Sequence, residues 1–96
     1  MTTYEFDATL WRWQAKESAI FLSLPFDVAD EIEAVAEPGK GFGSVRVEVA
    51  IGTSTWRTSV FPSAEEKTYV LPVKKAVRDA NGLEVGDACR VALSLV

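Results

Sequence analysis

The basic residues with the most chemical potential lie just after Pro72. Lys74 and Lys75 fall in the first turn of a predicted short helix, and Arg78 follows Lys74 on the same helical face. The first N–H groups of a helix have no partner inside it, and the helix dipole disfavours cations there by about 0.3–1 kcal/mol each. Free N–H groups beside two lysines suit an anion. We therefore expect Lys74, Lys75 and Arg78 to bind a small anion or an acidic group on a partner protein.

Three further polar residues could extend this anion site. Arg46 and Arg57, together with Ser59, fall on two strands expected to be neighbours, so a barrel could carry them toward the lysines. The alternative is a solvated helix face, in which the lysines pair with Glu65, Glu66 or the carboxylates of the first predicted helix. The sequence leaves both interpretations open.

Large aromatic residues form the other candidate site. They could line a groove for a ligand or a partner, and in so small a domain they could equally fill the core or cap the ends of a barrel. The residues concerned are Trp11, Trp13, Trp56, Phe42 and Phe61.

The residues that the chain lacks exclude several chemistries. With no histidine and one cysteine, it has no Cys/His zinc site and no Ser-His or Cys-His nucleophile pair. No carboxylate cluster has the spacing of metal ligands, so we predict no catalytic residue, no metal and no cofactor. Cys89 takes an inward position on its predicted strand, which favours a buried, unreactive thiol.

Composition and charge bound the remaining possibilities. The 96 residues are 48% hydrophobic and 25% charged, which predicts a single folded domain over 1–96. A formal net charge of −4 opposes general binding to nucleic acid or to anionic membranes. No segment has the length and apolarity of a membrane span or of a secretory signal, and one cysteine suits a reducing compartment. We therefore expect a cytoplasmic location.

Hydrophobic periodicity and turn residues predict the elements that must position these side chains. Alternating or continuous apolar runs indicate strands over 4–10, 18–24, 44–51, 54–61, 68–71 and 89–95. Helices are expected over 26–36, with Val28, Ile32, Val35 and Ala36 inward, and over 73–80, with Val73, Ala76, Val77 and Ala80 inward. Pro72 would open the second helix and Asn81-Gly82 would end it.

The predicted elements repeat. Each half of the chain reads strand, strand, Leu-Pro, helix, strand, with Leu24-Pro25 in the first half and Leu71-Pro72 in the second. The sequence thus predicts a mainly β fold: a small closed or double-split barrel of about six strands with two short helices. The two halves, 4–51 and 54–96, would be related by a pseudo-twofold axis that superposes the two prolines.

Two resemblances follow from these segments. The stretch from Leu71 to Asp87, in which a proline precedes a helix, a glycine and a Gly-Asp turn, resembles the swapped-hairpin half of AbrB/MazE-like proteins. Those proteins are dimers of one β-β-α-β unit, and many bind DNA. For this chain, with two such units, the resemblance implies a double-split barrel built as a monomeric pseudo-dimer.

Nearly the whole chain is also similar to a family of small bacterial domains of unknown function. The matching pieces are the runs 41–49 and 56–62 and the Leu-Pro-Val-Lys-Lys-Ala-Val-Arg stretch. Members of that family occur alone or fused to a domain similar to the YdeI/OmdA group. This resemblance implies a fold and leaves the activity open.

We interpret the chain as a monomeric, non-enzymatic binding module for a small anionic ligand or an acidic partner group. A DNA-binding regulator of the AbrB type is the alternative, and the acidic balance opposes it. A small enzyme comes third, since no nucleophile–base pair is visible.

Overall fold

A computed structural model describes residues 2–14, 19–35 and 43–96. Strands dominate this part of the chain, and two helices interrupt them. In chain order the elements are β1 (Thr3–Thr9), β2 (Trp11–Arg12), β3 (Ile20–Ser23), α1 (Phe26–Val35), β4 (Val45–Ile51), β5 (Ser54–Ser63), β6 (Thr68–Pro72), α2 (Lys75–Asn81) and β7 (Ala88–Leu95).

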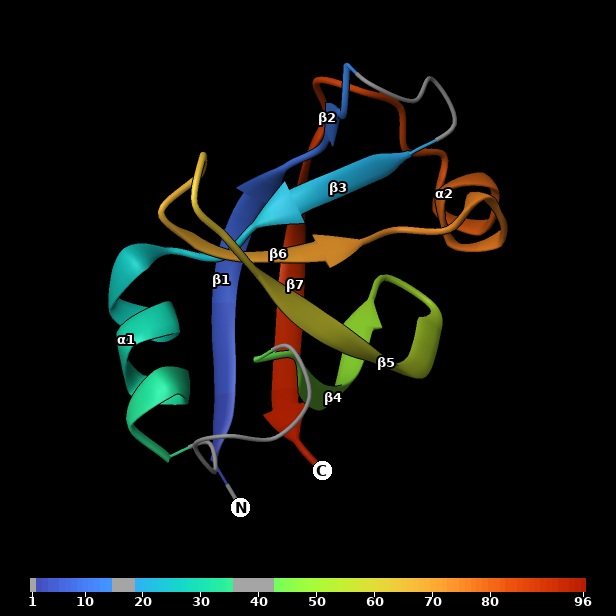
Figure 1. Cartoon of the computed structure of the whole chain (residues 1–96). Coiled ribbons are helices and arrows are strands. Elements are labelled where there is room, and N and C mark those ends of the chain that lie inside the picture. The colour runs from blue at the N-terminus through green and yellow to red at the C-terminus, as the bar shows by residue number, and fades with distance from the viewer. Residues whose placement is uncertain (1, 15–18, 36–42) are drawn as a thin grey trace.

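The strands form one curled sheet in the order β1-β7-β4-β5-β6-β3-β2. Every pair is antiparallel, and the sheet curls into a half-barrel with α1 and α2 on opposite sides of it (Figure 1). The mainly β architecture with two short helices is therefore confirmed. The first expected strand, 4–10, corresponds to β1 and ends before Leu10, whose N–H donates to the Asp87 carbonyl at 3.0 Å and whose carbonyl accepts from Gly86 N–H at 2.9 Å. This interruption separates β1 from β2, the two edge strands of the sheet.

The core lies on the concave side of the sheet, which we call the inner face. Along β4, Val47, Val49 and Ile51 are buried while the residues between them are more exposed. Side chains of successive strand residues point to opposite faces, so this alternation defines an inner and an outer face for the neighbouring strands as well. The cleanest alternation in the sequence therefore predicts β4 correctly.

The β3–β6 pair joins the two halves of the chain near one edge of the sheet. Phe21 pairs with Pro72 and Leu22 with Leu71. Beyond the ladder, Leu24 N–H donates to the Tyr69 carbonyl at 3.0 Å, and Val73 N–H donates to the Ile20 carbonyl at 2.9 Å. These two bonds are equivalent if the halves exchange places, because Leu24 then corresponds to Val73 and Ile20 to Tyr69.

This correspondence differs from the alignment expected from the two Leu-Pro pairs. With Leu24 matched to Val73, Pro25 falls on Lys74, whereas the expected alignment places Pro25 on Pro72, and that superposition stays a prediction. Pro25 directly precedes α1, whereas Pro72 is the last residue of β6. The internal repeat of 4–51 and 54–96 likewise stays a prediction.

The first helix buries fewer residues than its periodicity suggests. Val28, Ala29 and Ile32 are buried in α1, as two of the expected positions require. Val35 is 61% exposed, so its predicted inward position is wrong, and Ala36 lies outside the described residues. No helix in the described part of the chain is long and apolar enough to cross a membrane.

The second helix starts later than predicted. Pro72 pairs with Phe21 in the sheet instead of opening the helix, because β6 continues through it. Lys74 is the N-cap with extended backbone angles (φ −68°, ψ 158°), and its side chain makes no capping hydrogen bond. α2 therefore runs from Lys75, and Val73 is a buried residue of the connection.

The end of α2 is as predicted. Gly82 is the C-cap in the left-handed conformation (φ 62°), which glycine adopts without strain. Val77 is the buried residue of this helix, whereas Ala76 and Ala80 are exposed. The expected apolar stripe is wrong at those two positions, because α2 packs on the rest of the protein mainly through Val77.

Asn81 fastens α2 to the β4–β5 hairpin. Its side-chain oxygen accepts from Thr53 N–H at 3.0 Å, and its amide nitrogen donates to Ser54 Oγ at 3.0 Å and to the Val77 carbonyl at 2.9 Å. A Cβ added at Gly52 would collide with this side chain. A helix with so little buried surface depends on such polar contacts for its position.

Asn81→Ala should lower the free energy of unfolding by about 1–3 kcal/mol, because it removes the part-buried hydrogen bonds to Ser54 Oγ and the Val77 carbonyl and the exposed one from Thr53 N–H. Urea denaturation followed by circular dichroism measures the change. Glu84→Ala is the control, since the exposed Glu84 side chain makes none of the described hydrogen bonds, and it should change the value by less than about 0.5 kcal/mol. Equal effects of the two substitutions would contradict the proposed tether.

Candidate ligand-binding site

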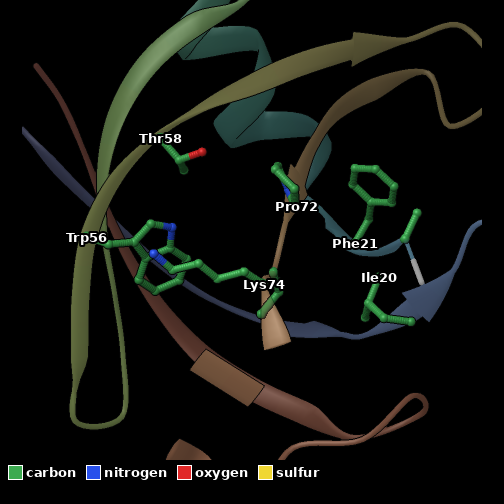
Figure 2. A pocket seen from close by; sticks show the side chains of 8 residues that line it. Ile20, Phe21, Trp56, Thr58, Pro72 and Lys74 are labelled. Carbon is green, nitrogen blue, oxygen red and sulfur yellow. The ribbon is translucent and has the colours of Figure 1, made fainter. Parts of the chain in front are cut away.

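Lys74 borders a pocket between β5 and the connection from β6 to α2. The pocket has a volume of about 220 Å³, and Figure 2 shows the Lys74 side chain extending toward Trp56. Thr58 lies beside Trp56 on β5, and Phe21 and Pro72 form the far wall (Figure 2). We call this the Lys74 pocket; its lining residues are Ala19, Ile20, Phe21, Trp56, Thr58, Pro72, Val73 and Lys74.

The register of β5 explains which of its side chains reach this pocket. Trp56 pairs with Val49 and Thr58 with Val47, both of which are inner-face residues. Cross-strand partners share a face, so Trp56 and Thr58 are on the inner face as well. β5 pairs with β6 only from Phe61 onward, and the Lys74 pocket occupies the space before that pairing begins.

The other predicted residues of β4 and β5 lie on the outer face. Arg46 pairs directly with Ser59, so these two are neighbours. Arg57 pairs with Glu48 and forms an ion pair with it, with Nε to Oε1 at 3.3 Å. Strand alternation therefore turns these side chains away from Lys74, and the structure does not bring the two groups of predicted residues together.

The two remaining basic residues, Lys75 and Arg78, bond to groups within α2 or in the connection before it. Lys75 Nζ lies 2.6 Å from Asp79 Oδ2, an exposed pair one helical turn apart. Arg78 Nε donates to the Val73 carbonyl at 3.1 Å. Within the described residues, no ion pair involves Lys74. Lys74 lines the first of the two depressions described for these residues, and none of the other expected cations lines either of them.

A second and larger depression lies on the outer face of the other half of the sheet. It has a volume of about 620 Å³, and we call it the aromatic groove. Its aromatic and proline side chains come from β2, β3, β6 and β5 in turn, since Trp11 pairs with Phe21, Phe21 with Pro72, and Val70 with Phe61. The lining residues are Trp11, Trp13, Phe21, Phe61, Pro62, Ser63, Ala64, Glu65, Glu66, Val70 and Pro72.

Ring packing and hydrogen bonds hold one wall of the groove. The Trp11 and Phe21 ring centroids are 5.4 Å apart, and those of Trp13 and Phe21 are 6.3 Å apart with the rings nearly perpendicular at 76°. Trp11 Nε1 donates to Ser23 Oγ at 2.9 Å, and Ser23 Oγ donates to Glu66 Oε1 at 3.2 Å. This chain of bonds ties the indole to the acidic turn between β5 and β6 and fixes both.

The aromatic residues expected to form a groove divide between the two depressions. Trp11, Trp13 and Phe61 line the aromatic groove, whereas Trp56 lines the Lys74 pocket. Phe42 lies outside the described residues. All three tryptophans of the chain thus border one of these sites.

Sequence reasoning missed two residues that belong to both depressions. Phe21 and Pro72 line the Lys74 pocket on one side and the aromatic groove on the other. The signal for Phe21 was present in the continuous apolar run 19–22, which favours a strand covered on both faces. For Pro72 the proline was assigned to the helix, which concealed its place in the sheet.

Cys89 is a half-buried residue packed against the core. Burial raises the pKa of its thiol, and the nearby Asp7 carboxylate raises that pKa further. Burial, and secondarily Glu33, likewise raises the pKa of the Tyr69 hydroxyl. Among the described residues, no group of three or more acidic or cysteine side chains could hold a metal ion.

The model of one known protein family matches most of this chain. Its description is Domain of unknown function (DUF1905), and it matches residues 6–93, from β1 into β7. The chain therefore belongs to this family. No curated protein matches the chain significantly.

The raised pKa of Cys89 predicts slow alkylation. A thiolate is the reactive form, and at pH 8 this thiol should hold a smaller thiolate fraction than a free cysteine with a pKa of about 8.5. Iodoacetamide labelling, followed by mass spectrometry, should be several times slower in the folded protein than in the urea-unfolded chain, and the difference should shrink as pH rises. Equal rates in the two states at pH 8 would contradict this assignment.

Proposed function

We propose that this protein is a non-enzymatic binding module whose Lys74 pocket receives the anionic group of a small ligand or of a partner protein. The observation that carries the proposal is the position of Lys74: its side chain extends along Trp56 at the mouth of an apolar pocket (Figure 2). The ammonium would meet the anion, and the indole and Phe21 would contact the apolar part of the same ligand.

The charges around the pocket support this choice among the expected cations. Lys75 is paired with Asp79 and Arg57 with Glu48, so a ligand at either residue would compete with a carboxylate already in place. Lys74 has no such competitor among the described residues, and Thr58 adds a hydroxyl to the pocket lining. An anion at Lys74 would therefore gain a charge-assisted hydrogen bond without breaking an ion pair.

The size of the pocket limits the ligand. About 220 Å³ is below the range of about 300–1,000 Å³ that drug-sized ligands occupy. Cavities of about 150 Å³ bind a single benzene ring. One ring or a short acyl chain carrying a carboxylate or phosphate group therefore fits best, and an acidic side chain of a partner would fit in the same way.

The predicted monomeric, closed double-split barrel belongs to the same proposal. The segment from β1 to β2 supports closure, because it reaches both edges of the sheet and is broken only at Leu10. A closed barrel would fix the spacing between β5 and β6 and hence the shape of the Lys74 pocket.

Benzoate and phenyl phosphate should bind to the protein, and Lys74→Met should weaken their binding at least about fivefold because it removes the charge and keeps most of the apolar stem. Isothermal titration calorimetry gives the dissociation constants, and tryptophan emission provides a second readout. Trp56→Phe should remove most of the emission change. Benzamide, which has the ring without the charge, should bind more weakly than benzoate.

Lys75→Met is the matched control for this experiment. It removes the neighbouring positive charge from the same helix end, but Lys75 is paired with Asp79 and does not line the pocket. Its effect on benzoate binding should be less than about twofold. Equal losses in the Lys74 and Lys75 variants, or no binding of either anion at millimolar concentration, would refute the proposal.

Duplex DNA should not bind with specific affinity at physiological salt. The net charge of −4 repels the phosphates, and Arg57, Lys75 and Arg90 are each paired with a carboxylate. Specific DNA-binding proteins reach about 10⁻⁸ M or tighter under such conditions. A mobility-shift titration that gave this affinity, with a steep dependence on salt, would favour the AbrB-type alternative instead.

A further inference from the structure

The aromatic groove offers a second binding surface of opposite charge. We propose that it receives a proline-rich segment of a partner protein that carries at least one arginine or lysine. Trp11, Trp13, Phe21 and Phe61 supply the apolar floor and wall, and Glu65 and Glu66 lie on the rim. This proposal goes beyond the Lys74 pocket, because it uses a different surface and a ligand of the opposite charge.

Exposed apolar surface is the first reason to expect an occupant. Trp13 is 47% exposed and Phe61 is 44% exposed, although both are large side chains that would bury well in a core. They lie in one depression, together with Pro62 and Pro72, rather than scattered over the surface. Gathered apolar side chains with a polar rim are typical of binding grooves.

The charge of the rim selects the partner. Glu65 and Glu66 both line the groove, and no ion pair involves either of them within the described residues. Lys67 follows in the same turn but does not line the groove. Ser23 Oγ donates to Glu66 Oε1, which holds that carboxylate beside Trp11. A cation on the partner would therefore meet the carboxylates of Glu65 and Glu66 next to aromatic rings. This arrangement favours arginine or lysine.

The backbone of the sheet decides the conformation of the partner. β3 and β6 are paired with neighbours on both sides, so a peptide lying across them cannot add itself as a strand, and the edge strand β2 is too short, at two residues, to pair with a segment of this length. It must be recognised through side chains that stack on rings. A polyproline II segment suits this, because it has no internal hydrogen bonds, loses little entropy on binding and presents flat apolar rings.

The dimensions of the groove set the length of the segment. Its lining residues come from four adjacent strands, β5, β6, β3 and β2. Neighbouring strands are about 4.8 Å apart, so the groove crosses about 14 Å of sheet. Polyproline II advances about 3.1 Å per residue, which makes the contacting segment about five residues long. Trp13, whose indole N–H has no hydrogen bond to another described residue, could donate to one of its carbonyls.

The test uses a seven-residue acetylated peptide with the sequence arginine, proline, proline, alanine, proline, proline, arginine. Calorimetric titration into the unmodified protein should show binding, with a change in tryptophan emission and an affinity that falls as salt rises. Two control peptides carry glycine in place of every proline, or glutamate in place of both arginines. Each should bind at least about fivefold more weakly.

Variants of the protein separate this groove from the Lys74 pocket. Changing Glu65→Gln and Glu66→Gln together should weaken the peptide about threefold to tenfold, since each ion pair contributes modestly at an exposed rim. Glutamine at position 66 keeps an oxygen for Ser23, so the fold is retained. Trp13→Ala should weaken the peptide further. Lys74→Met should leave peptide binding unchanged, and the double glutamine variant should leave benzoate binding unchanged.

Several results would overturn the proposal. One is the absence of peptide binding at millimolar concentration, and another is equal binding of the glycine or glutamate peptide. Tetramethylammonium binding as tightly as the peptide would indicate a site for small organic cations instead. A concentration-dependent dimer in sedimentation, dissociated by Phe61→Ser, would assign the groove to a second copy of this chain.

Discussion

The antiparallel pair of β3 and β6 is the interaction on which the rest of this structure depends. β3 leads into α1 and β6 leads into α2, so this pair joins the strands that precede the two helices. Hydrogen bonds from Leu24 N–H and Val73 N–H extend the pairing beyond the ladder. The pair sends α1 and α2 to opposite sides of the sheet (Figure 1). On the inner face of this pair, Leu22 and Leu71 belong to the core. On its outer face, Phe21 and Pro72 line the aromatic groove.

The two depressions meet at Phe21 and Pro72, which form a shared wall. On one side of this wall stands an ammonium group, and on the other stand two carboxylates. Phe21 and Pro72 thus stand between the depression that Lys74 lines and the one that Glu65 and Glu66 line. On the two proposals made above, ligands of opposite charge would occupy neighbouring depressions on either side of Phe21 and Pro72.

The predicted cation cluster and the observed arrangement differ for a simple reason. The prediction added Arg46, Arg57 and Ser59 to Lys74 because their two strands are neighbours and a barrel could carry them toward the second helix. The two strands do pair with each other. A strand, however, sends successive side chains to opposite faces, so Trp56 reaches the Lys74 pocket and Arg57 cannot. Whether a given strand residue reaches a site depends on a register that is set by the partner strand.

The amino-acid sequence by itself determined the features that depend on local rules. Alternation in 45–51 determines a strand and the glycine at position 82 a helix end, because each depends on residues close together in the chain. The absence of histidine excludes several chemistries whatever the fold. The tertiary structure alone decided that Pro72 belongs to the sheet, that Phe21 divides two sites and that Lys74 borders a pocket. Each of these follows from pairing between strands far apart in sequence, and local propensity carries no information about which distant strand will be the neighbour or in what register it will lie.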